Sequence, residues 1–211
     1  MIHTYTIDGL HVQTGDIICT TDSELDILPG DFWRLLGRML PGEVGHVAVY
    51  IGPGGRCVES AGRGVVAFTV EGNTWAVERM VKQRGQFMDR LYGVAYPLRG
   101  RGLAAEEEAR IRRSVADYCL AQAEAHKPYN LNFFNPDTEQ SFYCSQLPYR
   151  AYIAHGINLN TDQGVPNIPG ASVIVFPQEI WSGCQHQRVA DSGELGKAPT
   201  SRQARNPEGK K

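Results

Sequence analysis

The stretch GHVAVYIG, residues 45–52, is the clearest strand of this 211-residue chain, because β-branched and aromatic residues lie between two flanking glycines. A glycine-rich turn follows, and the second β-rich stretch, CVESA at residues 57–61, begins shortly after it. This order predicts an antiparallel hairpin. The predicted hairpin carries two side chains that can take part in proton transfer, because His46 opens its first strand and Glu59 lies in its second.

Strand and helix patterns alternate around this hairpin. The periodicity predicts strands at residues 17–19, 65–70, 91–96 and 173–176, and helices at residues 31–39, 104–125 and 144–155. Residues 71–90 fit neither pattern clearly. The length suits one domain, which we expect to span residues 1–188, and the polar residues 189–211 are expected to form a disordered tail.

The composition excludes several classes of protein. The formal net charge is −2, with no excess of basic residues, so nucleic acid is not an expected partner. The apolar runs are too short to predict a transmembrane segment. The start, MIHTYTIDGL, lacks the basic and apolar regions of a signal peptide, so we expect a protein made in the cytoplasm without one.

The cysteines favour neither disulfides nor a metal site. There are five, an odd number, and none form a CxxC pair. Cys184 and His186 form a C-x-H pair, but no second pair of ligands has suitable spacing for a tetrahedral zinc site. We therefore expect no metal and no other cofactor.

Cys144 is the candidate nucleophile. It lies in SFYCSQL, residues 141–147, where a polar loop meets the start of a predicted helix. The helix dipole and unpaired N–H groups at such a position favour the thiolate and can later hold an oxyanion. The alternative is a small buried hydrophobic side chain. That alternative suits Cys119, on the apolar face of a helix, and Cys19 and Cys57, in strands.

Three further residues have chemistry that complements a thiol. His46 is the first choice for a general base, with His11 as the second choice. Glu59 can bind the second ring nitrogen of His46 and fix its tautomer, or it can face water from an edge strand. Tyr129 can donate a hydrogen bond to an oxyanion, or it can anchor a loop.

Taken in order, five short motifs resemble the permuted NlpC/P60 proteins, the YiiX-like branch of the papain-like superfamily. The motifs are GDII at residues 15–18, GHVAVYIG at 45–52, VESA at 58–61, PYN at 128–130 and FYCSQL at 142–147. In ordinary NlpC/P60 proteins the cysteine helix precedes the histidine strand, whereas here His46 comes first. The resemblance covers residues 12–176 and is weakest over residues 71–102.

The resemblance implies a fold and a site. The fold would be α+β and papain-like, with a small antiparallel, barrel-like sheet packed against helices. Cys144 would be the nucleophile, His46 its base and Glu59 the residue that orients His46. Tyr129 would face the oxyanion. Family members often have aspartate after that tyrosine, whereas this chain has Asn130, which can form hydrogen bonds but carries no charge.

The expected activity is cleavage of an amide bond through a thioester, most simply in the peptides of peptidoglycan. A lipid or acyl substrate is an alternative, because the histidine strand also resembles that of the lecithin:retinol acyltransferase group. The cysteine motif of that group is typically Asn-Cys-Glu-His, whereas this chain has Tyr-Cys-Ser-Gln at residues 143–146. A third alternative is a non-catalytic binding module on the same fold.

A cell-wall substrate lies outside the cytoplasm, whereas the chain is expected to have no signal peptide. The two expectations are compatible if the protein is an antibacterial effector. Such a protein would reach the envelope of a neighbouring cell by a leaderless route. An inhibitor or immunity protein would then be an expected partner.

Overall fold

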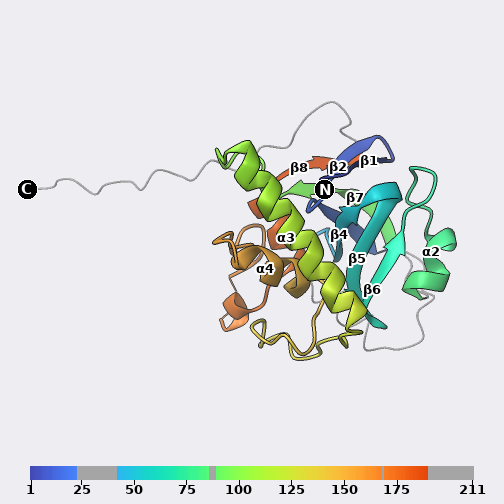
Figure 1. The fold of residues 1–211 in the computed structure, drawn as a ribbon. Helices are drawn as coiled ribbons and strands as arrows, with labels where there is room; N and C mark the ends of the chain where they lie inside the picture. The colour runs from blue at the N-terminus through green and yellow to red at the C-terminus, as the bar shows by residue number, and fades with distance from the viewer. Residues whose placement is uncertain (23–41, 86–88, 168, 190–211) are drawn as a thin grey trace, which may run out of the picture.

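The computed structural model describes residues 1–22, 42–85, 89–167 and 169–189. The helix expected at residues 31–39 and the tail from residue 190 onward lie outside these ranges. The predicted α+β class is confirmed, because helices pack against antiparallel sheets (Figure 1).

A six-stranded antiparallel sheet forms the centre of the described chain. Its strand order is β6-β5-β4-β3-β7-β8 (Figure 1). The strands are β3 (Ile17–Asp22), β4 (His46–Gly52), β5 (Arg56–Ala61), β6 (Gly64–Thr69), β7 (Asp89–Tyr96) and β8 (Gln185–Arg188). A separate hairpin consists of β1 (Thr4–Ile7) and β2 (Leu10–Gln13).

The predicted hairpin is confirmed in its antiparallel register. Val49 of β4 lies opposite Val58 of β5, and Ala48 lies opposite Glu59. A short 3-10 helix, η1 (Pro53–Gly55), makes the turn between the two strands. This turn requires glycine at residue 55, because its φ is 83° and a Cβ there would approach the carbonyl oxygen of Val70 to 2.1 Å.

Four helices cover the sheet within the described ranges: α2 (Val77–Arg84), α3 (Ala105–Glu124), α4 (Gln146–Ile153) and α5 (Pro177–Gly183). Figure 1 shows α3 crossing the sheet as the longest of them, with α4 on one side and α2 on the other. The predicted helices at 104–125 and 144–155 are thus confirmed, and α2 occupies the part of residues 71–90 that the sequence left unassigned.

Both faces of the sheet are buried, because successive residues of β4 contribute to two different cores. Val47 and Val49 pack with residues of α3, α4 and α5, whereas Ala48 and Tyr50 pack with α2 and the β1–β2 hairpin. Every residue of β4 is buried in consequence. This double burial explains why the strand is apolar almost throughout rather than alternating with polar residues.

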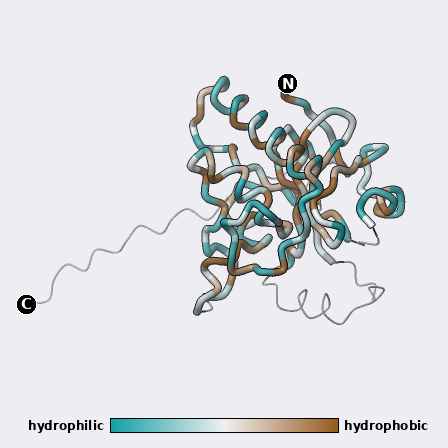
Figure 2. The backbone as a smooth tube through the Cα atoms, turned by 60° about the horizontal axis from the view of Figure 1, so that its bottom comes forward, coloured by the Kyte–Doolittle hydropathy of each residue, from teal (hydrophilic) through white to brown (hydrophobic). Residues whose placement is uncertain are grey.

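Hydrophobic and hydrophilic residues alternate at short intervals along the described chain (Figure 2). None of the helices in the described ranges is both long enough and apolar enough to cross a membrane.

The strand predicted at residues 173–176 is wrong. Val173 ends a 3-10 helix, η2 (Ala171–Val173), and Phe176 is the N-cap of α5. In a strand, the backbone of Val175 would hydrogen-bond a neighbouring strand. Here its partners are side chains: the Val175 N–H donates to the Tyr143 hydroxyl, and the Val175 carbonyl accepts from the Ser145 hydroxyl. The segment is therefore extended, but it supports the Cys144 turn instead of joining the sheet.

Candidate active site

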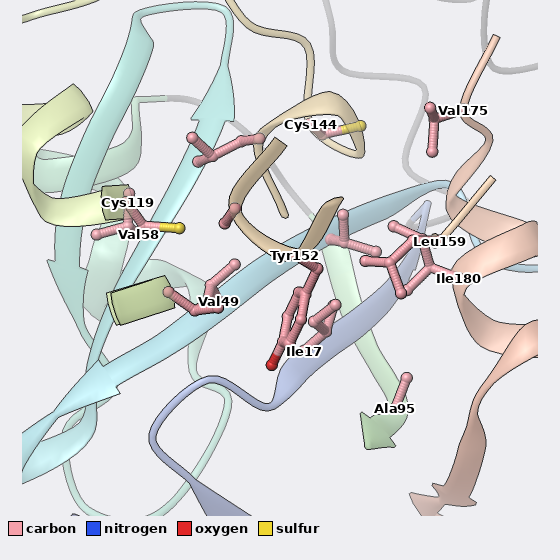
Figure 3. Packing of buried hydrophobic residues seen from close by; sticks show 14 of the residues in the cluster. Ile17, Val49, Val58, Ala95, Cys119, Cys144, Tyr152, Leu159, Val175 and Ile180 are labelled. Atoms are coloured by element: carbon pink, nitrogen blue, oxygen red, sulfur yellow. The ribbon is translucent and has the colours of Figure 1, made fainter. Parts of the chain in front are cut away.

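Cys144 lies on the turn that leads into α4, two residues before the helix begins. Its side chain belongs to the larger hydrophobic cluster and is 8% exposed. Figure 3 shows Cys144 at one end of this cluster, well separated from Cys119. Pro148 is in the first turn of α4, where proline is tolerated because the early N–H groups of a helix have no partner within it.

Hydrogen bonds on both sides hold the Cys144 turn. The Tyr143 N–H donates to Oε1 of Gln146 at 3.1 Å, and the Ser145 hydroxyl donates to the Val175 carbonyl at 2.6 Å. The Ser60 hydroxyl of β5 donates to the Phe142 carbonyl at 2.6 Å. The turn is therefore tied to the sheet and to the segment before α5, which fixes the position of the thiol.

His46 is 5% exposed at the start of β4 and contacts both of its expected partners. Its Nε2 lies 2.9 Å from Oε2 of Glu59, and the ring also hydrogen-bonds the Cys144 side chain. Burial lowers the pKa of His46, but the hydrogen bond with Cys144 and the hydrogen bond and charge of Glu59 outweigh it and raise the pKa to about 10. The imidazole is therefore protonated at neutral pH, and a protonated imidazole stabilises a neighbouring thiolate.

Glu59 is fully buried, so the alternative of a water-facing carboxylate is wrong. Burial alone raises the pKa of Glu59, but the charge of Arg84 and the hydrogen bond with His46 lower it to about 2. The side chain is an anion at neutral pH. It can therefore orient His46 and balance its positive charge.

Arg84 was not among the residues predicted from the sequence, and it binds Glu59 through two N–H groups at 2.9 and 2.7 Å. Arg84 is the last residue of α2, because Gly85 ends the helix with a φ of 85°. The guanidinium also binds Asp89, the first residue of β7. Arg84 and Asp89 both come from the range 71–90, which shows no clear periodicity. The sequence pattern therefore did not predict either residue as part of the site.

Tyr129 lies beside the Cys144 turn, as a backbone bridge between Tyr129 and Phe142 shows. Burial raises the pKa of the Tyr129 phenol, and the negative charge of Cys144 raises it further. The hydroxyl therefore stays protonated at neutral pH and can donate a hydrogen bond. The ring also packs edge-on against Phe133, with the ring centroids 6.4 Å apart, so the residue anchors its loop as well.

Asn130 and Gln146 form a second polar pair under this turn. The Asn130 amide donates to Oε1 of Gln146 at 2.9 Å, and Gln146 donates to the carbonyls of Pro136 and Thr138. Gln146 is fully buried. Oε1 of Gln146 can only accept a hydrogen bond, so its partner at position 130 must donate one. The amide of Asn130 can donate, whereas an aspartate carboxylate could not.

The other candidates from the sequence have ordinary structural surroundings. Cys19, Cys57, Cys119 and Cys184 are buried in the two cores. Burial raises the pKa of each of these four thiols. The ring of His11 contacts Thr6 within the β1–β2 hairpin, at 3.3 Å. His186 contacts the Cys184 carbonyl oxygen through Nδ1, at 2.9 Å.

Among the described residues, no group of three or more His, Cys, Asp or Glu side chains could hold a metal ion. A surface cavity lined by His11, Asp16, Arg99 and Arg112, among others, includes none of the residues around Cys144. The arrangement that can carry chemistry is thus a buried cysteine, histidine and glutamate in series, a constellation suited to nucleophilic attack by sulfur.

An α+β protein with a buried Cys-His-Glu arrangement is the class that fold and site define. No protein-family model, no curated protein and no solved structure matches the chain.

Proposed function

We propose that the protein is a cysteine hydrolase that cleaves an amide bond through a thioester intermediate. The observation that carries the proposal is the contact of His46 with both Cys144 and Glu59 in a buried site. Burial strengthens the electrostatic interactions in such a site, because little water competes for the groups. A cysteine without a catalytic role needs neither a histidine partner nor a buried anion behind it.

The reaction divides into two steps. The Cys144 sulfur attacks the substrate carbonyl, and the tetrahedral oxyanion takes hydrogen bonds from the Cys144 backbone N–H and the Tyr129 hydroxyl. His46 then gives its proton to the leaving amine, which breaks the amide bond and leaves the thioester. A water molecule, deprotonated by His46, hydrolyses the thioester and returns Cys144 with the free acid.

We further propose that the fold is the permuted NlpC/P60 variant of the papain-like fold. In support, the histidine strand β4 precedes the cysteine turn in the chain, and α4 packs with that strand in the same core. The orienting carboxylate comes from the next strand of the hairpin.

Peptidoglycan peptides are the proposed substrate class, because they are the substrates of most ordinary NlpC/P60 enzymes. The test is digestion of purified peptidoglycan by the wild-type protein and by Cys144→Ala, with the soluble fragments separated by chromatography. New fragments bearing a free amine and a free carboxylate are expected from the wild type alone. Identical fragment patterns from both proteins would reject the proposal.

One observation favours a lipid or acyl substrate as a second candidate. Leu131 and Phe134 are 61% and 66% exposed, although their loop is anchored to the Cys144 turn through Asn130 and Gln146. Large apolar side chains at the surface, in a loop tied to the Cys144 turn, can contact an acyl chain or a lipid surface. Release of fatty acid from phospholipid vesicles by the wild type, but not by Cys144→Ala, would favour this candidate over peptidoglycan.

A further inference from the structure

The carboxylate of Glu59 is shared between two cationic side chains. Its Oε2 lies 2.9 Å from Nε2 of His46 and 2.7 Å from Nη2 of Arg84, and its Oε1 accepts from Nε of Arg84 at 2.9 Å. The side chains of Glu59 and Arg84 are both 0% exposed. The two-pronged contact leaves the carboxylate one orientation, in which Oε2 points at the histidine.

Arg84 is itself fixed from behind. Asp89 accepts from Nη1 and Nη2 of Arg84 at 2.8 and 2.9 Å, and the indole N–H of Trp75 donates to Asp89 at 3.1 Å. The guanidinium also lies 4.8 Å from the ring centroid of Phe68 and 4.9 Å from that of Trp75. Residues of β5, β6, β7 and the loop before α2 thus converge on one cation.

Without His46, the cluster of Glu59, Arg84 and Asp89 carries one more negative charge than positive charges. Glu59 and Asp89 carry two negative charges, and Arg84 carries one positive charge. A protonated His46 supplies the second positive charge. Fold stability does not demand such a cluster, because apolar side chains of similar volume often stabilise a core equally well. A cluster that ends on the proposed base suggests a role in the site instead.

We propose that Arg84 is the positioning residue of the active site, which holds Glu59 as an anion aimed at His46, so that the reactivity of Cys144 depends on Arg84. The proposal rests on the proposed role of Cys144 as nucleophile. Arg84 acts through Glu59, to which it donates two hydrogen bonds.

The pH dependence follows from the groups that face this cluster. They are His46 on β4, Cys57 and Glu59 on β5, Arg84 on α2, Asp89 on β7 and Cys144 before α4. Without the charge of Arg84, the pKa of Glu59 would rise from about 2 by about one to three units, since burial would then dominate. Protonated Glu59 no longer stabilises the imidazolium, so the reactive form of Cys144 would be lost at higher pH than in the wild type.

The experiment is the pH profile of Cys144 alkylation by iodoacetamide, followed by mass spectrometry of the peptide that contains Cys144. Arg84→Met removes the charge, and Arg84→Lys keeps it but loses the two-pronged contact. We expect the acid limb of the profile to move up by about one to three pH units in Arg84→Met and by less in Arg84→Lys. If Arg84→Met fails to fold, the Arg84→Lys profile decides between the same two outcomes.

The matched control is Arg112→Met, because Arg112 forms another buried ion pair, with Asp16 at 2.8 Å. Asp16 lies directly before β3. The residue of β3 that lies opposite His46 is Thr20, which is about 13 Å from Asp16 along the strand. The control should keep the wild-type profile. An unchanged acid limb in both Arg84 variants would overturn the role of Arg84 while leaving Cys144 as nucleophile. A wild-type Cys144 that reacts like an ordinary buried thiol would instead overturn the proposed function.

Discussion

Glu59 hydrogen-bonds Nε2 of His46 at 2.9 Å, although the residue directly across the hairpin from Glu59 is Ala48. His46 is two residues before Ala48, so the two side chains are diagonal neighbours on one face of the sheet. Diagonal pairs on antiparallel strands lie within reach of long side chains. The register of one hairpin therefore sets the orientation of the proposed base.

Glu59→Gln tests the charge of the orienting residue. The amide keeps a hydrogen-bonding group but removes the negative charge that helps to raise the pKa of His46 to about 10. We expect kcat to fall by about 10²–10⁴-fold, and the alkaline limb of activity to move to lower pH. Kinetics over a range of pH measure both. A variant with wild-type kcat and an unmoved alkaline limb would show that Glu59 plays only a structural part.

Stability should depend on pH through the same pair. The pKa of Glu59 is lowered from 4.5 to about 2, so its contribution is present above pH 4.5 and is lost as the pH falls through about 2. The pKa of His46 is raised from 6.5 to about 10, so its contribution is present below pH 6.5 and is lost as the pH rises through about 10. The two shifts share one interaction, so their energies do not add.

We therefore expect the contribution of this pair to be largest between about pH 4.5 and pH 6.5, by about 3 kcal/mol relative to pH 2. Urea unfolding at a series of pH values measures it in the wild type and in Glu59→Gln. The variant should lose most of the acid-side slope. The same slope in both proteins would assign it to other carboxyl groups.

Gln146→Leu tests the support beneath the Cys144 turn. It leaves the Tyr143 N–H, the Asn130 amide and two carbonyls without their buried partner. We expect the free energy of unfolding to fall by about 2–5 kcal/mol, and kcat to fall because the turn is no longer fixed. The control is Gln140→Leu, an exposed glutamine of the loop before the Cys144 turn, and it should be close to neutral. Equal effects of the two variants on unfolding would contradict this account.

Tyr129→Phe tests the proposed oxyanion donor, because it removes the hydroxyl but keeps the ring that packs on Phe133. We expect kcat to fall by about 10²–10³-fold with little change in KM. The control is Tyr118→Phe. In the wild type, the Tyr118 hydroxyl on α3 donates to Glu139. If both variants lose the same modest activity, the Tyr129 hydroxyl does not act on the oxyanion.

Much of the fold and the core of the site could be read from the sequence. Strong strand patterns and a glycine-rich turn predicted the hairpin of His46 and Glu59, and the register then brought those two side chains together. The helix after Cys144 was predictable because its apolar periodicity is clear. These features depend on residues close together in the sequence, where local preferences and pattern are informative.

The features that were not predicted correctly from the sequence depend on contacts between residues far apart in the chain. Val173 to Phe176 has strand-like side chains, but its hydrogen-bond partners are the side chains of Tyr143 and Ser145, which no local pattern reveals. Arg84 meets Glu59 and Asp89 only through tertiary packing, because Arg84 lies on α2 whereas the two carboxylates lie on β5 and β7. A charged residue within an unassigned stretch looks like a solvated surface residue until its buried partner is known.

The most direct test of the central claim is competition among the five cysteines for a limiting amount of iodoacetamide at about pH 6. Peptide mass spectrometry then shows which sulfur carries the label in the wild type and in His46→Ala. The Cys144–His46 pair predicts label on Cys144 in the wild type and its loss in His46→Ala, with the other four thiols unlabelled in the folded protein. Label spread evenly over the cysteines, or labelling of Cys144 that does not depend on His46, would contradict the account.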